Sequence, residues 1–307
     1  MSRHLATVLV IDMLTLERLN SITALPYQAF TFPTFRSHLQ CLGTSCIAIG
    51  AVKDGCPVGL ILAELSADLK RAEVRSIFVT QSARNQGIGT ALLGALEQSL
   101  ADQGCAEVQL VYMTGKPSAS ILERLLEKYC WTVPQTRMLV GRSTIDRMAQ
   151  APWMAQSHLP ATFTIFPWDQ LTHEERSYLQ HQQITADWIP SDLAPLEQEP
   201  IESLNSLGVR YQGTIVGWVI THRLNLDTIR YTCSFIRADF QRRGRIIPLY
   251  VEAIRRQAQA GIRNGIWTVP LRHTAMFNFV QNRMAPYMTS IALTKGAKKS
   301  LSSEQSG

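Results

Sequence analysis

The sequence predicts two copies of one α+β fold, each with a mixed β-sheet and helices packed against it. The chain has 307 residues, enough for two domains of ordinary size. Four glycines of the first half recur in the second half at an offset of 157 or 158 residues. They are Gly50, Gly55, Gly59 and Gly87, which return as Gly208, Gly213, Gly217 and Gly244. Each set lies in the same order of apolar segments, so the chain is a tandem duplication.

The first copy begins with a hairpin, because two β-rich segments flank Lys53-Asp54-Gly55. Leucines at helical spacing follow after Gly89, and a second amphipathic segment ends near Tyr129. The predicted strands are 46–52, 58–64, 73–80 and 107–113, and the predicted helices are 89–102 and 118–129. A further apolar run at 5–11 is expected to be a first strand rather than a signal peptide, because acidic residues follow it closely.

The second copy repeats this order. Its predicted strands are 207–211, 216–222, 229–236 and 265–269, and its predicted helices are 245–258 and 274–283. Three prolines between the copies are typical of a linker. The expected division is therefore a first domain at 1–148, a linker at 149–167, a second domain at 168–294 and a flexible polar tail at 295–307.

Composition excludes several classes of protein. With 46% apolar and 18% charged residues the chain is expected to be globular, and no window is apolar enough to cross a membrane. The six cysteines include no C-x-x-C pair, which favours free thiols in a reducing cytoplasm and no metal site. The net charge is +6, but aromatic residues do not alternate with the basic residues as in many nucleic-acid-binding surfaces. Nucleic acid is therefore not an expected partner.

The segment Arg84-Asn85-Gln86-Gly87-Ile88-Gly89 joins a predicted strand to a predicted helix. Two glycines allow a tight turn with inward-facing amides, and the helix adds its unpaired N–H groups and the positive end of its dipole. Such a loop suits phosphate groups, although a simple strand-to-helix turn has the same pattern. It matches neither the nucleotide-hydrolase loop nor the dinucleotide-binding loop.

This loop resembles the pyrophosphate loop R/Q-x-x-G-x-G/A of the GNAT superfamily of CoA-dependent N-acyltransferases. The order of strands and helices is similar in both copies. The resemblance implies a tandem GNAT fold that uses acetyl-CoA or a longer acyl-CoA. It also implies that main-chain groups of one strand and one loop hold this co-substrate. These residues are Ile77, Val79, Arg84, Asn85, Gln86, Gly87, Ile88, Gly89 and Thr90.

The resemblance also implies catalytic residues. Glu73, 14 residues before Gly87, occupies the place from which some members deprotonate the amine, and the alternative is a solvated residue at a strand start. Many members have a tyrosine where this chain has Leu126. Tyr129, or else Tyr112, is then the candidate general acid for the thiolate.

The second copy departs from the pattern. Ile246 replaces the second small residue of the loop, Pro248 removes an amide, and Arg230 occupies the Glu73 position. We therefore expect a degenerate domain. Its arginines either form a solvated face or contact CoA phosphates or an acidic acyl-carrier protein.

The expected function is N-acyl transfer by direct attack of a primary amine, carried by a small molecule or peptide, on an acyl-CoA thioester. Two alternatives stay open. One is a fatty-acyl transferase that uses acyl-CoA or acyl-carrier protein to lipidate a peptide or natural-product amine. The other is a non-catalytic module that binds acyl-CoA.

Overall fold

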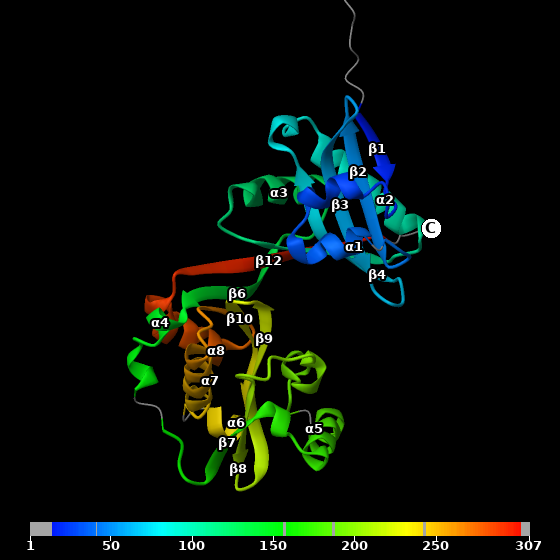
Figure 1. Cartoon of the computed structure of the whole chain (residues 1–307). Helices are drawn as coiled ribbons and strands as arrows, with labels where there is room; N and C mark the ends of the chain where they lie inside the picture. Colours follow the sequence, from blue (N-terminus) through cyan, green and yellow to red (C-terminus); the bar gives the residue numbers. More distant parts are fainter. Residues whose placement is uncertain (1–13, 41, 156–157, 186–187, 242–243, 302–307) are drawn as a thin grey trace, which may run out of the picture. The chain divides into compact units, whose positions relative to one another are not determined.

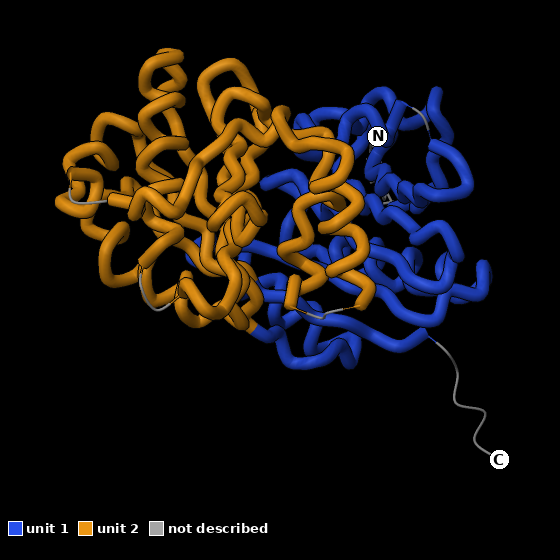
Figure 2. Tube along the Cα trace, turned by 90° about the horizontal axis from the view of Figure 1, so that it is seen from below, with its two compact units in different colours: residues 1–135, 295–307 blue, residues 136–294 orange. Residues whose placement is uncertain are grey.

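The computed structural model describes residues 14–40, 42–155, 158–185, 188–241 and 244–301. It divides into two compact units (Figure 2). Unit 1 consists of residues 1–135 and 295–307, and unit 2 consists of residues 136–294. The sequence predicts a boundary at 148 instead, and the strand expected at 5–11 lies outside the described residues. Each described helix is too short or too polar to cross a bilayer.

Unit 1 contains a mixed sheet whose strands have the order β1-β2-β3-β4-β5-β12. Neighbours among β1 to β4 are antiparallel, and β4 and β5 are parallel. The strands are β1 (Leu14–Arg18), β2 (Cys46–Lys53), β3 (Cys56–Leu65), β4 (Arg71–Val79), β5 (Glu107–Met113) and the C-terminal part of β12 (Ser290–Ser300). The helices are η1 (Leu25–Phe30), η2 (Pro33–Phe35), α1 (Arg36–Gln40), η3 (Gln81–Ala83), α2 (Ile88–Asp102) and α3 (Pro117–Lys128) (Figure 1).

Helix α2 forms the centre of the unit 1 core. Leu92, Leu93, Leu96 and Leu100 are fully buried, as their helical spacing predicts, and they belong to one cluster with residues of β2, β3 and β4. The opposite face of β3 packs against a smaller cluster around Tyr27 of η1. The sheet therefore has α2 on one face and the 25–40 segment on the other.

Unit 2 repeats this plan. Its sheet has the order β12-β6-β11-β10-β9-β8-β7, and β10 and β11 are the parallel pair. The strands are the N-terminal part of β12, β6 (Gln135–Thr144), β7 (Phe163–Pro167), β8 (Leu207–Tyr211), β9 (Thr214–Asn225), β10 (Thr228–Ile236) and β11 (Asn264–Pro270). The helices are α4 (Ile145–Met148), η4 (Pro152–Met154), η5 (Trp168–Gln170), α5 (His173–Thr185), η6 (Ser191–Leu193), η7 (Leu196–Gln198), α6 (Ala238–Gln241), α7 (Ile247–Gln259), α8 (Thr274–Phe279), the π-helical turn η8 (Val280–Met284) and η9 (Ala285–Tyr287).

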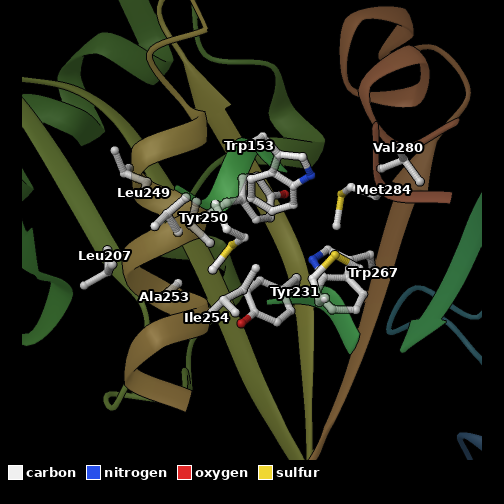
Figure 3. Packing of buried hydrophobic residues seen from close by; sticks show 14 of the residues in the cluster. Trp153, Leu207, Tyr231, Leu249, Tyr250, Ala253, Ile254, Trp267, Val280 and Met284 are labelled. Carbon is white, nitrogen blue, oxygen red and sulfur yellow. The ribbon is translucent and has the colours of Figure 1, made fainter. Parts of the chain in front are cut away.

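The core of unit 2 lies between α7 and the sheet. Figure 3 shows Leu249, Tyr250 and Ile254 of α7 among buried side chains that also come from the strands. The rings of Tyr231 and Trp267 stack with centroids 4.8 Å apart, which adds to the stabilisation from their burial. Trp153 belongs to this cluster, so part of the segment expected to be a linker packs in the core.

The repeated glycines are required for the same structural reasons in both units. A Cβ on Gly50 or Gly208 would overlap an aromatic ring, of Tyr27 and Phe166 respectively. The other repeated pairs lie at close strand contacts, at hairpin turns, or at the start of α2 and α7. The offset in the sequence therefore reflects one fold built twice.

The segment expected to be a flexible tail contains the last strand of unit 1. The amide of Leu301 donates to the carbonyl of Ala106 at 2.8 Å, and Ala297 is buried in the unit 1 core. Lys299 Nζ lies 2.5 Å from Glu97 Oε2 of α2, a carboxylate that also accepts from Trp131 Nε1 at 2.7 Å. The Glu97 side chain is only 10% exposed, so it depends on these two donors.

We expect Lys299→Ala to destabilise unit 1 by roughly 2 kcal/mol, because it leaves a nearly buried carboxylate with one neutral donor. Lys298→Ala is the matched control. Its side chain is 61% exposed, and its ion pair with Glu107 should contribute at most about 1 kcal/mol. Hydrogen exchange of peptides covering residues 88–102 measures the difference. Equal exchange in the two variants would contradict the role given to Lys299.

Candidate active site

The parallel strands β4 and β5 separate partway along their length. Their pairing runs from Arg71 opposite Glu107 to Val74 opposite Leu110 and ends there, although β4 continues to Val79. Among the described residues, the main chain of β4 beyond Val74 therefore has no strand partner on the β5 side. Free main-chain groups at this edge can pair with an extended ligand.

A β-bulge at Arg75 marks the point of separation, because Leu62 lies opposite Ser76 and Ala63 lies opposite Val74. Arg75 Nη1 contacts Glu73 Oε1 at 2.7 Å, and its Nε donates to Glu64 Oε2 at 2.9 Å. Glu64 and Glu73 lie directly opposite each other on β3 and β4. One guanidinium thus joins two carboxylates, each about one-third exposed.

Successive residues of β4 face different surroundings. Ile77 and Val79 pack against the cluster that contains α2. Phe78 faces the other side, where its ring stacks on Phe30 with centroids 5.0 Å apart. Ser76 also donates to the carbonyl of Phe30. The Glu73 side of the sheet is therefore bordered by aromatic residues of the 25–40 segment.

The loop after β4 has left-handed backbone at two positions, with φ of +61° at Asn85 and +78° at Gly87. Asparagine and glycine tolerate this region better than other residues. Arg84 Nε donates to the carbonyl of Val79 at 3.1 Å, and Gln86 contacts Lys53 at 2.9 Å. These contacts hold the loop at the end of β4.

The amides of residues 85–90 form the most distinctive part of the site. Within the described ranges no group accepts a hydrogen bond from any of these six amides, whereas Ala91 already donates to the Gly87 carbonyl. The loop is exposed, and it leads into the 15-residue helix α2. Consecutive free amides at a helix N-terminus bind anions such as phosphates.

The two candidate proton donors have hydrogen-bond partners of their own. Tyr129 donates to the carbonyl of Thr90 at 2.8 Å and lies against Gly94 of α2. Tyr112 donates to Glu123 at 2.5 Å, and burial together with this carboxylate raises the pKa of Tyr112 above its usual range. Leu126, which stands where many members of the resembled family have a tyrosine, is fully buried.

The described part of the corresponding loop of unit 2 has fewer free amides. The amide of Ile247 bonds to the carbonyl of Gly244 at 3.0 Å, and Pro248 has no amide. Arg245 extends over the ring of Phe163, with its Cζ 5.6 Å from the centroid. Arg237 and Arg256 pair with Asp239 and Glu252. Two further arginines of this basic stretch, Arg242 and Arg243, lie outside the described residues.

Sequence reasoning missed Glu64 and Arg75. Glu64 could have been found, because aligning the two predicted strands as a hairpin places it opposite Glu73. A β-bulge, however, has no sequence signature of its own, so the position of Arg75 between the two carboxylates could not be derived from alternation.

A mixed sheet with two separating parallel strands and an amide-rich loop after the first of them defines an acyltransferase fold of the GNAT type. Residues 16–126 match the model of the family described as "Acetyltransferase (GNAT) family". Unit 1 therefore contains a domain that matches the GNAT family, and its fold is built twice in the chain. Members of this family catalyse N-acyl transfer in general.

Solved structures share the tandem fold over nearly the whole chain. One is a tandem GNAT protein from the clavulanic acid biosynthesis pathway, with 10% identity, a TM-score of 0.68 and coverage of 95% of this chain and 100% of that one. Another is a GCN5-related N-acetyltransferase from Sphaerobacter thermophilus, with 16% identity, a TM-score of 0.67 and coverage of 94% and 96%. At these identities the likeness shows the fold alone. A search of the curated proteins found no match.

Proposed function

We propose that unit 1 transfers an acyl group, acetyl in the first instance, from acyl-CoA to the primary amine of a small molecule or peptide. The observation that carries this proposal is the run of six amides at 85–90 without an acceptor among the described residues, in the loop that follows the part of β4 separated from β5. This loop offers donors for the CoA pyrophosphate, and α2 adds its dipole.

The free edge of β4 suits the rest of the donor. Main-chain groups near Ile77 and Val79 would pair with the pantetheine arm as an added strand does. An amide of the same edge would donate to the thioester carbonyl. A donor at this point stabilises the oxyanion that forms when the amine attacks the carbonyl carbon.

Glu73 is the proposed acceptor of the amine proton, directly or through one water. Its Oε1 bonds to Arg75, so the second carboxylate oxygen is the one available to the substrate. An amine attacks only in its neutral form, and a positioned base contributes roughly 10²–10⁴-fold. The nearby Phe30, Phe35 and Phe78 favour an acceptor whose amine has apolar or aromatic neighbours.

The leaving thiolate does not depend on Tyr129 in this mechanism, because the phenol already donates to the Thr90 carbonyl. We expect Tyr129→Phe to cost about 1 kcal/mol of stability through the lost hydrogen bond and to leave kcat near the wild-type value. Thermal denaturation and steady-state kinetics measure the two effects. A fall of roughly 10²-fold or more in kcat would instead identify Tyr129 as the general acid.

We assign the protein to a reducing compartment, the cytoplasm, which suits the free thiols of Cys46, Cys56, Cys105, Cys130 and Cys233.

The donor is tested by native mass spectrometry of the purified chain for bound acyl-CoA. A thermal-shift screen then compares acetyl-CoA with longer acyl-CoAs and with acyl-carrier protein. The best donor is finally assayed for turnover with a panel of amines. Absence of both donor binding and turnover would contradict the proposal.

A further inference from the structure

The site residues of unit 1 have direct structural counterparts in unit 2 that differ in charge. Parallel pairing of β10 and β11 ends where Tyr231 lies opposite Trp267. These two residues are each 157 positions after Val74 and Leu110, the last parallel pair of unit 1. The bulge recurs at Thr232, 157 residues beyond Arg75. Glu73 corresponds to Arg230, and its partner across the sheet, Glu64, corresponds to His222. Unit 2 thus keeps the geometry of this site and replaces its two carboxylates.

The three counterparts in unit 2 form a connected network. His222 Nε2 lies 2.7 Å from the carbonyl of Gln198, which can only accept, so this nitrogen carries a proton. In the neutral ring Nδ1 then accepts from the Thr232 hydroxyl at 2.7 Å. That hydroxyl in turn accepts from Arg230 Nε at 2.9 Å. The network orients Arg230 through its Nε, and within the described residues neither of its Nη groups has a hydrogen-bond partner.

Arg230 lines a cavity of about 510 Å³, a volume within the usual range for small-molecule sites. The walls come from β6, η6, β10, β11 and the turn after β11, all within unit 2. The lining includes Arg137, Arg230 and Arg272 together with Met138, Leu193 and Leu271. The lining combines three guanidinium groups with apolar side chains.

The charges of this cavity are unbalanced. Asp192 is its only carboxylate among the described residues, and it is already paired with Arg272 at 2.5 Å and with His273 at 2.7 Å. Neither Arg230 nor Arg137 has an acidic partner in the part of the chain that the structure describes. Burial lowers the pKa of Arg230, because its charged form loses part of its hydration. An anion supplied by a ligand would compensate this charge.

We propose that this cavity of unit 2 binds a small molecule that carries a carboxylate, with Arg230 as the anchoring cation and an apolar body against Leu193, Leu271 and Met138. A planar carboxylate fits the two free Nη groups in a bidentate pair. The cavity lining has no helix N-terminus of the kind that binds phosphate at the loop of unit 1. This inference does not depend on the acyl transfer proposed for unit 1.

The test is a thermal-shift titration of the full chain with 3-phenylpropionate, hexanoate and succinate. 3-Phenylpropanamide and inorganic phosphate serve as comparison ligands. We expect at least one carboxylate to raise the Tm and the amide to have no effect. Arg230→Gln should abolish the shift, and Arg230→Lys should reduce it because the ammonium cannot form the bidentate pair. Arg255→Gln is the matched control, since this arginine is exposed on α7 outside the cavity.

Circular dichroism and the Tm of each variant without ligand show whether the chain is folded, independently of the cavity and of the function proposed for unit 1. The inference is overturned if no carboxylate raises the Tm, or if the amide or phosphate raises it equally. It is also overturned if Arg230→Gln keeps the response, or if Arg255→Gln loses it to the same extent as Arg230→Gln.

Discussion

Gly87→Trp should abolish binding of acetyl-CoA while the protein stays folded. The indole would lie over the amides of residues 85–90, which have no acceptor among the described residues. Loss of two charge-assisted hydrogen bonds of about 1.5–3 kcal/mol each weakens binding by more than roughly a hundredfold. Isothermal titration calorimetry with acetyl-CoA measures this directly.

The control for this experiment is Gly55→Trp in the β2–β3 hairpin. Gly55 and Gly87 have nearly the same backbone, with φ of +76° and +78°, and a Cβ at either position meets no atom within 4 Å. Both substitutions should therefore cost roughly 1–2 kcal/mol of stability through the left-handed backbone. Only Gly87→Trp should affect the donor. Equal donor affinity in the two variants would remove the loop from the site.

Glu73→Gln should lower kcat/KM by roughly 10²–10⁴-fold, the usual contribution of a general base. In the proposed mechanism this carboxylate accepts the proton of the attacking amine. The amide cannot take the proton at any pH. The pH profile of the variant should then follow only the ionisation of the free amine.

Glu64→Gln separates catalysis from the ion pair. Glu64 contacts the same guanidinium of Arg75 and lies opposite Glu73 in the sheet, so its loss disturbs the same network. A partly exposed ion pair contributes about 0.2–1 kcal/mol, and the rate should stay within roughly fivefold of the wild type. If both variants lose activity equally and keep the wild-type pH profile, Glu73 is a structural residue.

Most of the fold could be predicted from the sequence, because the glycines and the apolar periods that recur in both copies indicate local backbone structure. The leucines of α2 have a helical period, and Gly55 supplies the hairpin backbone that its turn requires. The tandem fold and the family are confirmed. The predicted helix at 274–283 is instead interrupted by a π-helical turn at Val280, which periodicity alone does not reveal.

The site was harder to predict because it depends on pairing between distant strands. Glu73 and the loop at 84–89 follow from a motif, and their roles remain predictions. The contact of Arg75 with Glu64 needs the register of β3 against β4 and a bulge. The cavity of unit 2 depends on the contact between Asp192 and His273, which follows β11. These residues are some 80 positions apart in the chain, so no local pattern predicts their contact.

The strand at 290–300 has a consequence for how the protein is made. Unit 1 contains residues 1–135 but receives its last strand from residues after 294. During synthesis the ribosome must complete all of unit 2 before that strand emerges, and until then the edge of β5 is open to wrong pairing. A fragment cut after residue 135 would keep this open edge. An independent acyltransferase domain therefore requires a polypeptide in which the two distant pieces of chain are joined.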